Sequence, residues 1–205
     1  MEVFVFPLVN VTLFPATTKP LNIFEPRYIK MIKDAVAQNK PVALAFIENP
    51  LEMNETKPGE ALKFVRPVCG YGQVQIVEER DNGTLLVFLY GLGKIKLGVL
   101  KASAEPYLVC EAEILSETNE LLEADKKTLT ILHQMLMAWI GRHITDPMQR
   151  DVFTRSIAKP EEVVGAFASY LVRDQDMQQE VLQLSSLSEK IRVLYRLAGS
   201  AELSL

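Results

Sequence analysis

The chain has 205 residues, 48% of them hydrophobic and 23% charged, which is enough apolar material for one large domain or two small ones. Its net charge of −4 gives no overall cationic footprint of the kind that nucleic-acid binders need for phosphate contacts. The N-terminal stretch has no basic residue before Lys19 and is interrupted by Pro7 and Asn10, which does not fit a secretory signal, and no run is long and apolar enough to span a membrane. We therefore expect a cytoplasmic protein.

The first half of the chain has the pattern of many short strands, interrupted by one helix that begins at Pro26. Strand patterns cover residues 2–6, 41–48, 72–79, 84–91, 94–101 and 107–115. Asn82-Gly83 predicts a hairpin with a type I′ turn, which needs positive φ at both central residues. We expect a polar loop over residues 49–62 and a bend at Gly91 and Gly93 between two strands. Short strands joined by tight turns predict a small β-barrel.

After about residue 116 the apolar period changes to three and four residues, which predicts helices. The first is a long amphipathic helix over residues 120–143, and further helices are expected to begin at Asp146-Pro147, Pro160, Asp174 and Ser186. Gly199 is expected to end the last one. The predicted fold class is therefore α+β, with a β-barrel subdomain over residues 1–116 and a helical bundle subdomain over residues 117–205.

The sequence shows no constellation of residues that would carry out a reaction. His133 and His143 would lie about 15 Å apart on one helix, too far to share a metal ion. Gly91-Leu92-Gly93-Lys94 lacks the glycine spacing of a P-loop and is followed by a strand pattern. Cys69 and Cys110 are expected to be reduced and buried, since a disulfide would need an oxidising compartment. We expect no catalytic residue, no cofactor and no metal.

The stretch from Phe24 to Tyr28 places two opposite charges inside an apolar run. Proline disfavours the helical region for the residue before it, so Glu25 is expected to be extended and Pro26 to be the first helical residue. Arg27 at a helix N-terminus opposes the helix dipole, which predicts a specific partner, either Glu25 or loop carbonyls. We expect Phe24 and Tyr28 to pack into the barrel and Arg27 to make buried hydrogen bonds. Arg27→Ala would then lower stability by about 1–3 kcal/mol.

The same stretch resembles a known family. Pro7-Leu8, Leu13-Phe14-Pro15 and the run from Pro20 to Tyr28, with the glycine-led strand and the hairpin that follow, look like the N-terminal substrate-binding domain of Lon proteases. They look still more like stand-alone bacterial proteins that contain only this domain. Two positions depart from the family pattern: Ala16 stands where glycine is common, and Lys94 stands where the family has arginine, whose bidentate contacts lysine does not reproduce.

The resemblance implies a pseudo-barrel like that of PUA domains, followed by a helical bundle. It also implies a role in capturing polypeptides, since this region of Lon proteases helps to bind substrates. The ATPase and Ser-Lys protease modules that follow it there do not fit in this chain, and no Walker motif is present. The resemblance thus implies a binding module and not an enzyme.

Our leading hypothesis is a non-catalytic module that binds unfolded or flexible polypeptide segments or another protein. Residues considered as partner contacts are Phe14, Phe24, Tyr71, Tyr90 and Lys94, and core burial is the alternative for each aromatic residue. RNA binding is a second hypothesis because PUA-like barrels often bind RNA, although Lys94, Lys96 and Lys101 are the only basic cluster. An unrecognised hydrolase and an adaptor for a separate protease are further alternatives.

Overall fold

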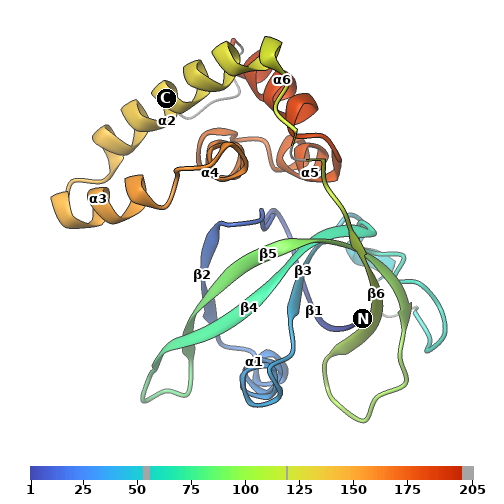
Figure 1. Cartoon of the computed structure of the whole chain (residues 1–205). Helices are drawn as coiled ribbons and strands as arrows, with labels where there is room; N and C mark the ends of the chain where they lie inside the picture. The colour runs from blue at the N-terminus through green and yellow to red at the C-terminus, as the bar shows by residue number, and fades with distance from the viewer. Residues whose placement is uncertain (53–55, 119, 200–205) are drawn as a thin grey trace. The chain divides into compact units, whose positions relative to one another are not determined.

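The structure is a computed structural model that describes residues 1–52, 56–118 and 120–199. Within these residues it contains one six-stranded sheet and six α-helices, which confirms the predicted α+β class. The chain divides into two compact units, Met1–Leu115 and Ser116–Leu205 (Figure 1). We propose that these units correspond to the two subdomains that the sequence predicts.

The first unit is built on a sheet that closes on itself. Its strands are β1 (Glu2–Leu8), β2 (Thr18–Ile23), β3 (Val42–Phe46), β4 (Val68–Glu79), β5 (Leu85–Leu100) and β6 (Leu108–Leu115). The strand order is β2-β5-β4-β3-β1-β6, and β5 also pairs with β6, so five strands form a closed ring. Among the described strands β2 pairs only with β5 and lies at the edge of the sheet (Figure 1). Closure leaves few exposed strand edges, as expected for a small barrel.

Strand β1 has both faces buried, because the unit has two apolar clusters and β1 lies between them. Val3 and Val5 belong to a cluster with buried residues of β3, β5 and β6. Phe4 and Phe6 belong to a second cluster with α1 (Pro26–Gln38). The four buried positions of α1 lie at three- and four-residue spacing, so one side of the helix faces this second cluster: Tyr28, Met31, Ile32 and Ala35.

The start of α1 follows the prediction in its backbone but not in its side chains. Glu25 is extended, Pro26 is the first helical residue, and Tyr28 is buried. Phe24, however, is 70% exposed, so the expectation that it packs into the barrel is wrong. The expectation of buried hydrogen bonds from Arg27 is also wrong. Its guanidinium lies at the surface, 2.8 Å from the Glu25 carboxylate and above the Tyr28 ring, because a partner two residues away meets its charge without burial.

The predicted hairpin joins β4 and β5, but its turn is not type I′. Gly83 has a φ of +80°, whereas Asn82 does not have positive φ. The Gly83 amide donates to the Arg80 carbonyl, and the Asn82 side-chain oxygen accepts from the backbone amide and the hydroxyl of Thr84. These bonds make a three-residue loop with glycine in the left-handed region, which is a common alternative to the two-residue turn.

Two strand assignments in the first unit differ from expectation. Residues 84–91 and 94–101 do not form two strands with a bend between them, because β5 runs without a break from Leu85 to Leu100. Its pairing with β4 shifts at Leu92, where an extra residue is absorbed as a bulge. Strand β2 is not among the predicted strands. Its sequence, TKPLNI, contains a lysine, a proline and an asparagine, which weaken a strand pattern.

The second unit consists of helices, as the change of period predicts. They are η2 (Glu123–Asp125), α2 (Lys126–His143), α3 (Pro147–Arg155), α4 (Pro160–Leu171), α5 (Gln175–Gln183) and α6 (Leu187–Ala198). The long helix begins at Lys126 and not at residue 120, because the residues before it form a loop and a 3-10 turn. The predicted N-caps hold: side-chain oxygens of Asp146, Asp174 and Ser186 each accept from a backbone amide three residues on. None of the described helices is apolar over a length that would cross a bilayer.

Candidate functional site

Strand β5 is apolar on both of its faces over residues 85–90. Leu85, Val87 and Leu89 are buried in the cluster with α1. Phe88 and Tyr90 alternate with them and are 39% and 48% exposed. A strand that is apolar on both faces is normally covered on both. The exposed face of β5 is therefore a candidate contact surface.

The strands on either side of β5 extend this surface. Directly opposite residues of antiparallel strands point to the same face of a sheet, and β2, β5 and β4 lie side by side (Figure 1). The pairing therefore gives rows across the three strands: Thr18–Tyr90–Gln73, Pro20–Phe88–Gln75 and Asn22–Leu86–Glu78. We call this set of nine residues the outer β5 face.

The outer β5 face has one formally charged side chain, that of Glu78 at its hairpin end. Its other margins are amides and a hydroxyl, and the Gln73 amide donates to the side-chain oxygen of Asn39, 3.1 Å away. Glu78 lies opposite Leu86 and is paired with Arg80 at 3.4 Å, so the rows that hold Phe88 and Tyr90 carry no formal charge. These two uncharged rows, apolar with polar margins, suit an apolar side chain of a partner.

Two of the five predicted contact residues are exposed. Tyr90 lies on the outer β5 face, and Phe24 directly follows β2. Tyr71 is half-buried and packs against the cluster inside the barrel. Phe14 and Lys94 are buried, each 1% exposed.

The burial of Phe14 and Lys94 has a clear cause in the fold. Residues 13 and 14 cross close to β4 and β5, where a Cβ at Gly70 would overlap the Leu13 carbonyl and one at Gly91 the Phe14 carbonyl. Lys94 is on β5 between Gly70 of β4 and Leu115 of β6. Because neither side chain offers surface to a partner, we leave both out of the candidate site.

Sequence reasoning did not single out Leu86, Phe88 or Pro20. A signal for the first two was present in TLLVFLYG, which is apolar at odd and even positions alike, whereas neighbouring strands alternate apolar with polar residues. Pro20 gave no such signal, because its place beside Phe88 depends on the pairing of β2 with β5.

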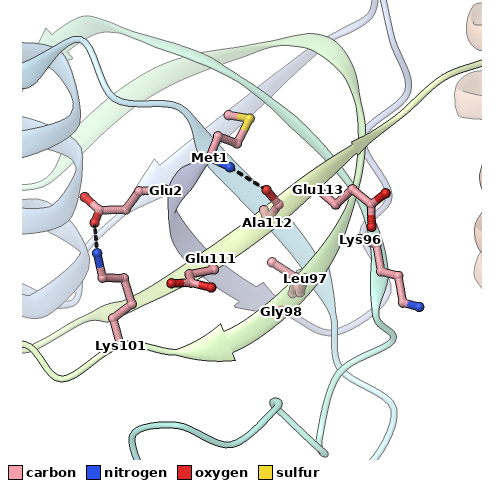
Figure 2. Close-up of a pocket in the computed structure, with 9 residues that line it drawn as sticks. All are labelled: Met1, Glu2, Lys96, Leu97, Gly98, Lys101, Glu111, Ala112 and Glu113. Atoms are coloured by element: carbon pink, nitrogen blue, oxygen red, sulfur yellow. Dashed lines mark hydrogen bonds and ion pairs between the residues drawn. The ribbon is translucent and has the colours of Figure 1, made fainter.

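A second candidate is a hollow of about 470 Å³ at the β5–β6 pairing (Figure 2). Charges of both signs line it, and the Glu2 carboxylate lies 2.5 Å from the Lys101 ammonium, which with Lys40 holds the pKa of Glu2 below its usual range. The Met1 amine donates to the Ala112 carbonyl at 2.6 Å. None of the nine lining residues is aromatic, His, Cys or Ser. The charged lining of the hollow therefore does not suit an apolar segment.

The two cysteines and His143 do not form a reactive site with one another. Cys69 and Cys110 are free and buried, and burial raises the pKa of Cys69 and raises that of Cys110 to about 12, so both are thiols at neutral pH. His143 lies over the Trp139 ring, with Nδ1 2.9 Å from the Trp139 carbonyl. In the part of the chain that the structure describes, no three potential ligand side chains gather around a possible metal position.

Helix α3 also exposes large apolar side chains, and no residue of it is buried. Met148 and Val152 are 78% and 65% exposed and lie one helical turn apart. Asp151 lies three residues after Met148 and Arg155 three residues after Val152, so both share their side of the helix. Charges thus interrupt this surface, unlike the rows of Phe88 and Tyr90 on the outer β5 face.

Two solved structures with the same fold are N-terminal domains of Lon proteins. The N-terminal domain of a Mycobacterium avium complex Lon protease has a TM-score of 0.72 at 15% identity and matches 98% of this chain and 100% of its own. A Lon N-terminal domain protein from Xanthomonas campestris has a TM-score of 0.66 at 16% identity over 96% of this chain and 98% of its own. A family model for the substrate-binding domain of the ATP-dependent protease La (LON) matches residues 2–198, and the chain belongs to this family.

Curated relatives are full Lon proteases. That of Dictyoglomus thermophilum is 22% identical over 206 residues, which is 97% of this chain and 24% of the relative. Lon protease 2 of Desulfotalea psychrophila is 23% identical over 193 residues, 92% of this chain and 24% of the relative. The chain thus spans about a quarter of the length of these proteases.

Proposed function

We propose that the chain is a non-catalytic polypeptide-binding module and that the outer β5 face, together with Phe24, is its contact surface. The family match supports a substrate-recognition role. The observation that supports this choice of surface is that one face of β5 is apolar and exposed, whereas its opposite face is equally apolar and buried. The family match offers no support for RNA binding.

The partner that fits this surface is a polypeptide with exposed apolar side chains. Phe88 and Tyr90 supply rigid aromatic area, and the amides beside them can exchange hydrogen bonds with water or with a partner backbone. Folded proteins bury most of their large apolar side chains, so unfolded or flexible segments present them more often. The free cysteines fit the cytoplasmic location that the sequence predicts.

The non-enzymatic character of the module is part of the proposal. The match to Lon proteases covers only about a quarter of their length, in the region that the family model describes as substrate-binding. The buried thiols of Cys69 and Cys110 stay protonated at neutral pH and are therefore not activated nucleophiles.

A titration with an unfolded polypeptide tests the proposal. The probe is a protein kept unfolded by carbamidomethylation of its cysteines, and binding is followed by calorimetry. The double variant F88S/Y90S should bind it about tenfold or more weakly, because two exposed aromatic contacts are lost. Its unfolding free energy in urea should stay within about 1 kcal/mol of the unmodified chain, since neither side chain is buried.

Helix α3 provides the matched control. M148S/V152S also removes two exposed apolar side chains, from a surface with charges beside them. It should leave the affinity within about twofold. Equal binding by all three chains, or no binding by any, would overturn the proposal.

A further inference from the structure

We propose that the outer β5 face selects extended, uncharged segments with large apolar side chains at every second residue, and that it binds them through side chains and not by strand addition to β2. This inference rests on the proposed function and names the class of segment that the same surface takes. It follows from the free edge of β2, the spacing of the apolar residues on β5, and the absence of charge in the rows of Phe88 and Tyr90.

The edge of β2 is closed to another strand at its centre. The Gly91 amide donates to the Thr17 carbonyl at 2.9 Å, so residue 17 is at a hydrogen-bonded position facing β5. Hydrogen-bonding positions alternate along an antiparallel strand. Lys19 and Leu21 therefore also bond toward β5, and the backbone of Thr18, Pro20 and Asn22 faces the free edge.

Pro20 has no N–H to donate at that edge. A strand added to β2 would meet a missing donor in the middle of a six-residue strand, together with the proline ring. Prolines at sheet edges block strand addition in this way. A polypeptide captured here is therefore held by the face of the sheet and not by its edge.

The face offers apolar side chains at a regular spacing. Leu86, Phe88 and Tyr90 are each two residues apart on one strand, which places neighbouring side chains about 7 Å apart. In an extended segment, side chains on one face recur at the same spacing. Such a segment laid along β5 can therefore contact all three residues with three of its own side chains.

The surroundings of Phe88 and Tyr90 select against charge. Thr18 and Pro20 lie on one side of them and Gln73 and Gln75 on the other, whereas Leu86 has Glu78 opposite it, paired with Arg80. A charged side chain that contacts Phe88 or Tyr90 would lose water and find no opposite charge in these two rows. Aromatic or aliphatic side chains lose no such hydration.

Synthetic peptides of equal length test the inference with the unmodified chain, by fluorescence anisotropy. The alternating peptide has three leucines at alternate positions in a background of serine and glutamine, and the clustered peptide has the same composition with adjacent leucines. A third peptide replaces the middle leucine of the alternating peptide by glutamate. A fourth carries N-methyl groups on the backbone of the residues between the leucines.

The alternating peptide should bind about fivefold more tightly than the clustered and the glutamate peptides, since each loses at least one apolar contact. N-methylation should change its affinity by less than about twofold, because no backbone pairing is lost. Equal affinity for the alternating and clustered peptides, a tenfold loss on N-methylation, or no peptide binding would overturn the inference. If F88S/Y90S still weakens binding of the unfolded polypeptide in that case, the proposed function stands and only the selection rule falls.

The variant P20V provides a second check on the closed edge. Valine restores an N–H at the free edge and keeps an apolar side chain in the row with Phe88. If the proline closes the edge, N-methylation should weaken peptide binding to P20V more than binding to the unmodified chain. If N-methylation of the peptide markedly weakened its binding to both P20V and the unmodified chain, and to the same extent, strand addition would occur despite Pro20. That result would overturn the inference.

Discussion

The two faces of β5 are equally apolar in sequence and differ in what covers them. Leu85, Val87 and Leu89 are buried in the cluster that includes residues of α1, whereas Phe88 and Tyr90 are 39% and 48% exposed on the opposite side. The contrast shows that apolar character alone does not assign a residue to the core. The inner face should determine stability, and the outer face should determine binding, so substitutions on the two faces should separate these properties.

The largest effect on stability is expected at Gly91, where β5 meets the loop that crosses it. A Cβ there would overlap the Phe14 carbonyl oxygen, which belongs to backbone and cannot rotate away. Gly91→Ala should lower the unfolding free energy by about 4 kcal/mol or more, measured in urea, or prevent folding. Gly141→Ala on α2 is the matched control: nothing lies within 4 Å of its Cβ, and it should gain about 0.5–1 kcal/mol. A loss under about 1 kcal/mol at Gly91 would contradict this packing.

Adjacent residues of β5 should give the next largest contrast. Leu89→Ala removes a fully buried side chain and should cost about 2–5 kcal/mol in urea unfolding. Tyr90→Ala, one residue on, should cost under about 1 kcal/mol because about half of that side chain is already in water. Similar losses at both positions would mean that both faces are covered, and the outer β5 face would then not be available to a partner.

A smaller effect, of opposite sign, is expected at Ala16. This residue has a φ of +57°, in the left-handed region, and follows Pro15 in the turn that leads the chain to β2. Glycine adopts this conformation without strain, so Ala16→Gly should raise the unfolding free energy by about 1 kcal/mol. Peptide binding should not change, since the turn lies outside the outer β5 face. A lower melting temperature for Ala16→Gly would contradict the inference that the backbone of Ala16 is strained.

The smallest effect is expected at Arg27. Its ion pair with Glu25 is solvent-exposed, so Arg27→Ala should lower the unfolding free energy by less than about 1 kcal/mol. This expected loss is smaller than the one predicted from the sequence, which assumed buried hydrogen bonds. Thermal unfolding at low and high salt measures it, and the difference should shrink with salt. Unchanged stability with lost peptide binding would add Arg27 to the contact surface.

Much of the fold could be predicted because local signals and packing agree. Pro26, Asp146, Asp174 and Ser186 mark helix starts that the structure confirms, since caps act within one turn of the chain. Strand β2 could not be predicted, because its six residues become a strand only by pairing with β5. The same is true of the turn at Asn82-Gly83, whose type depends on how β4 and β5 are registered.

The candidate site was harder to predict than the fold. Tyr90 and Phe24 were chosen as aromatic residues in the strand-rich half, and they are exposed, but Phe14 was chosen on the same ground and is buried. The exposure of a side chain depends on which elements cover it, and these elements can be far away in the sequence. The rows that join Phe88 to Pro20 and Gln75 come from strands far apart in sequence, so only the sheet reveals them.

Site-specific photo-crosslinking tests the role of the outer β5 face most directly. A benzophenone side chain is placed at position 90 on β5 or at position 148 on α3, both exposed, and each chain is irradiated with an unfolded polypeptide. We predict crosslinks from position 90, lost when excess alternating peptide is added, and few from position 148. Equal yields from both positions, or crosslinks from position 148 alone, would contradict a binding surface on β5.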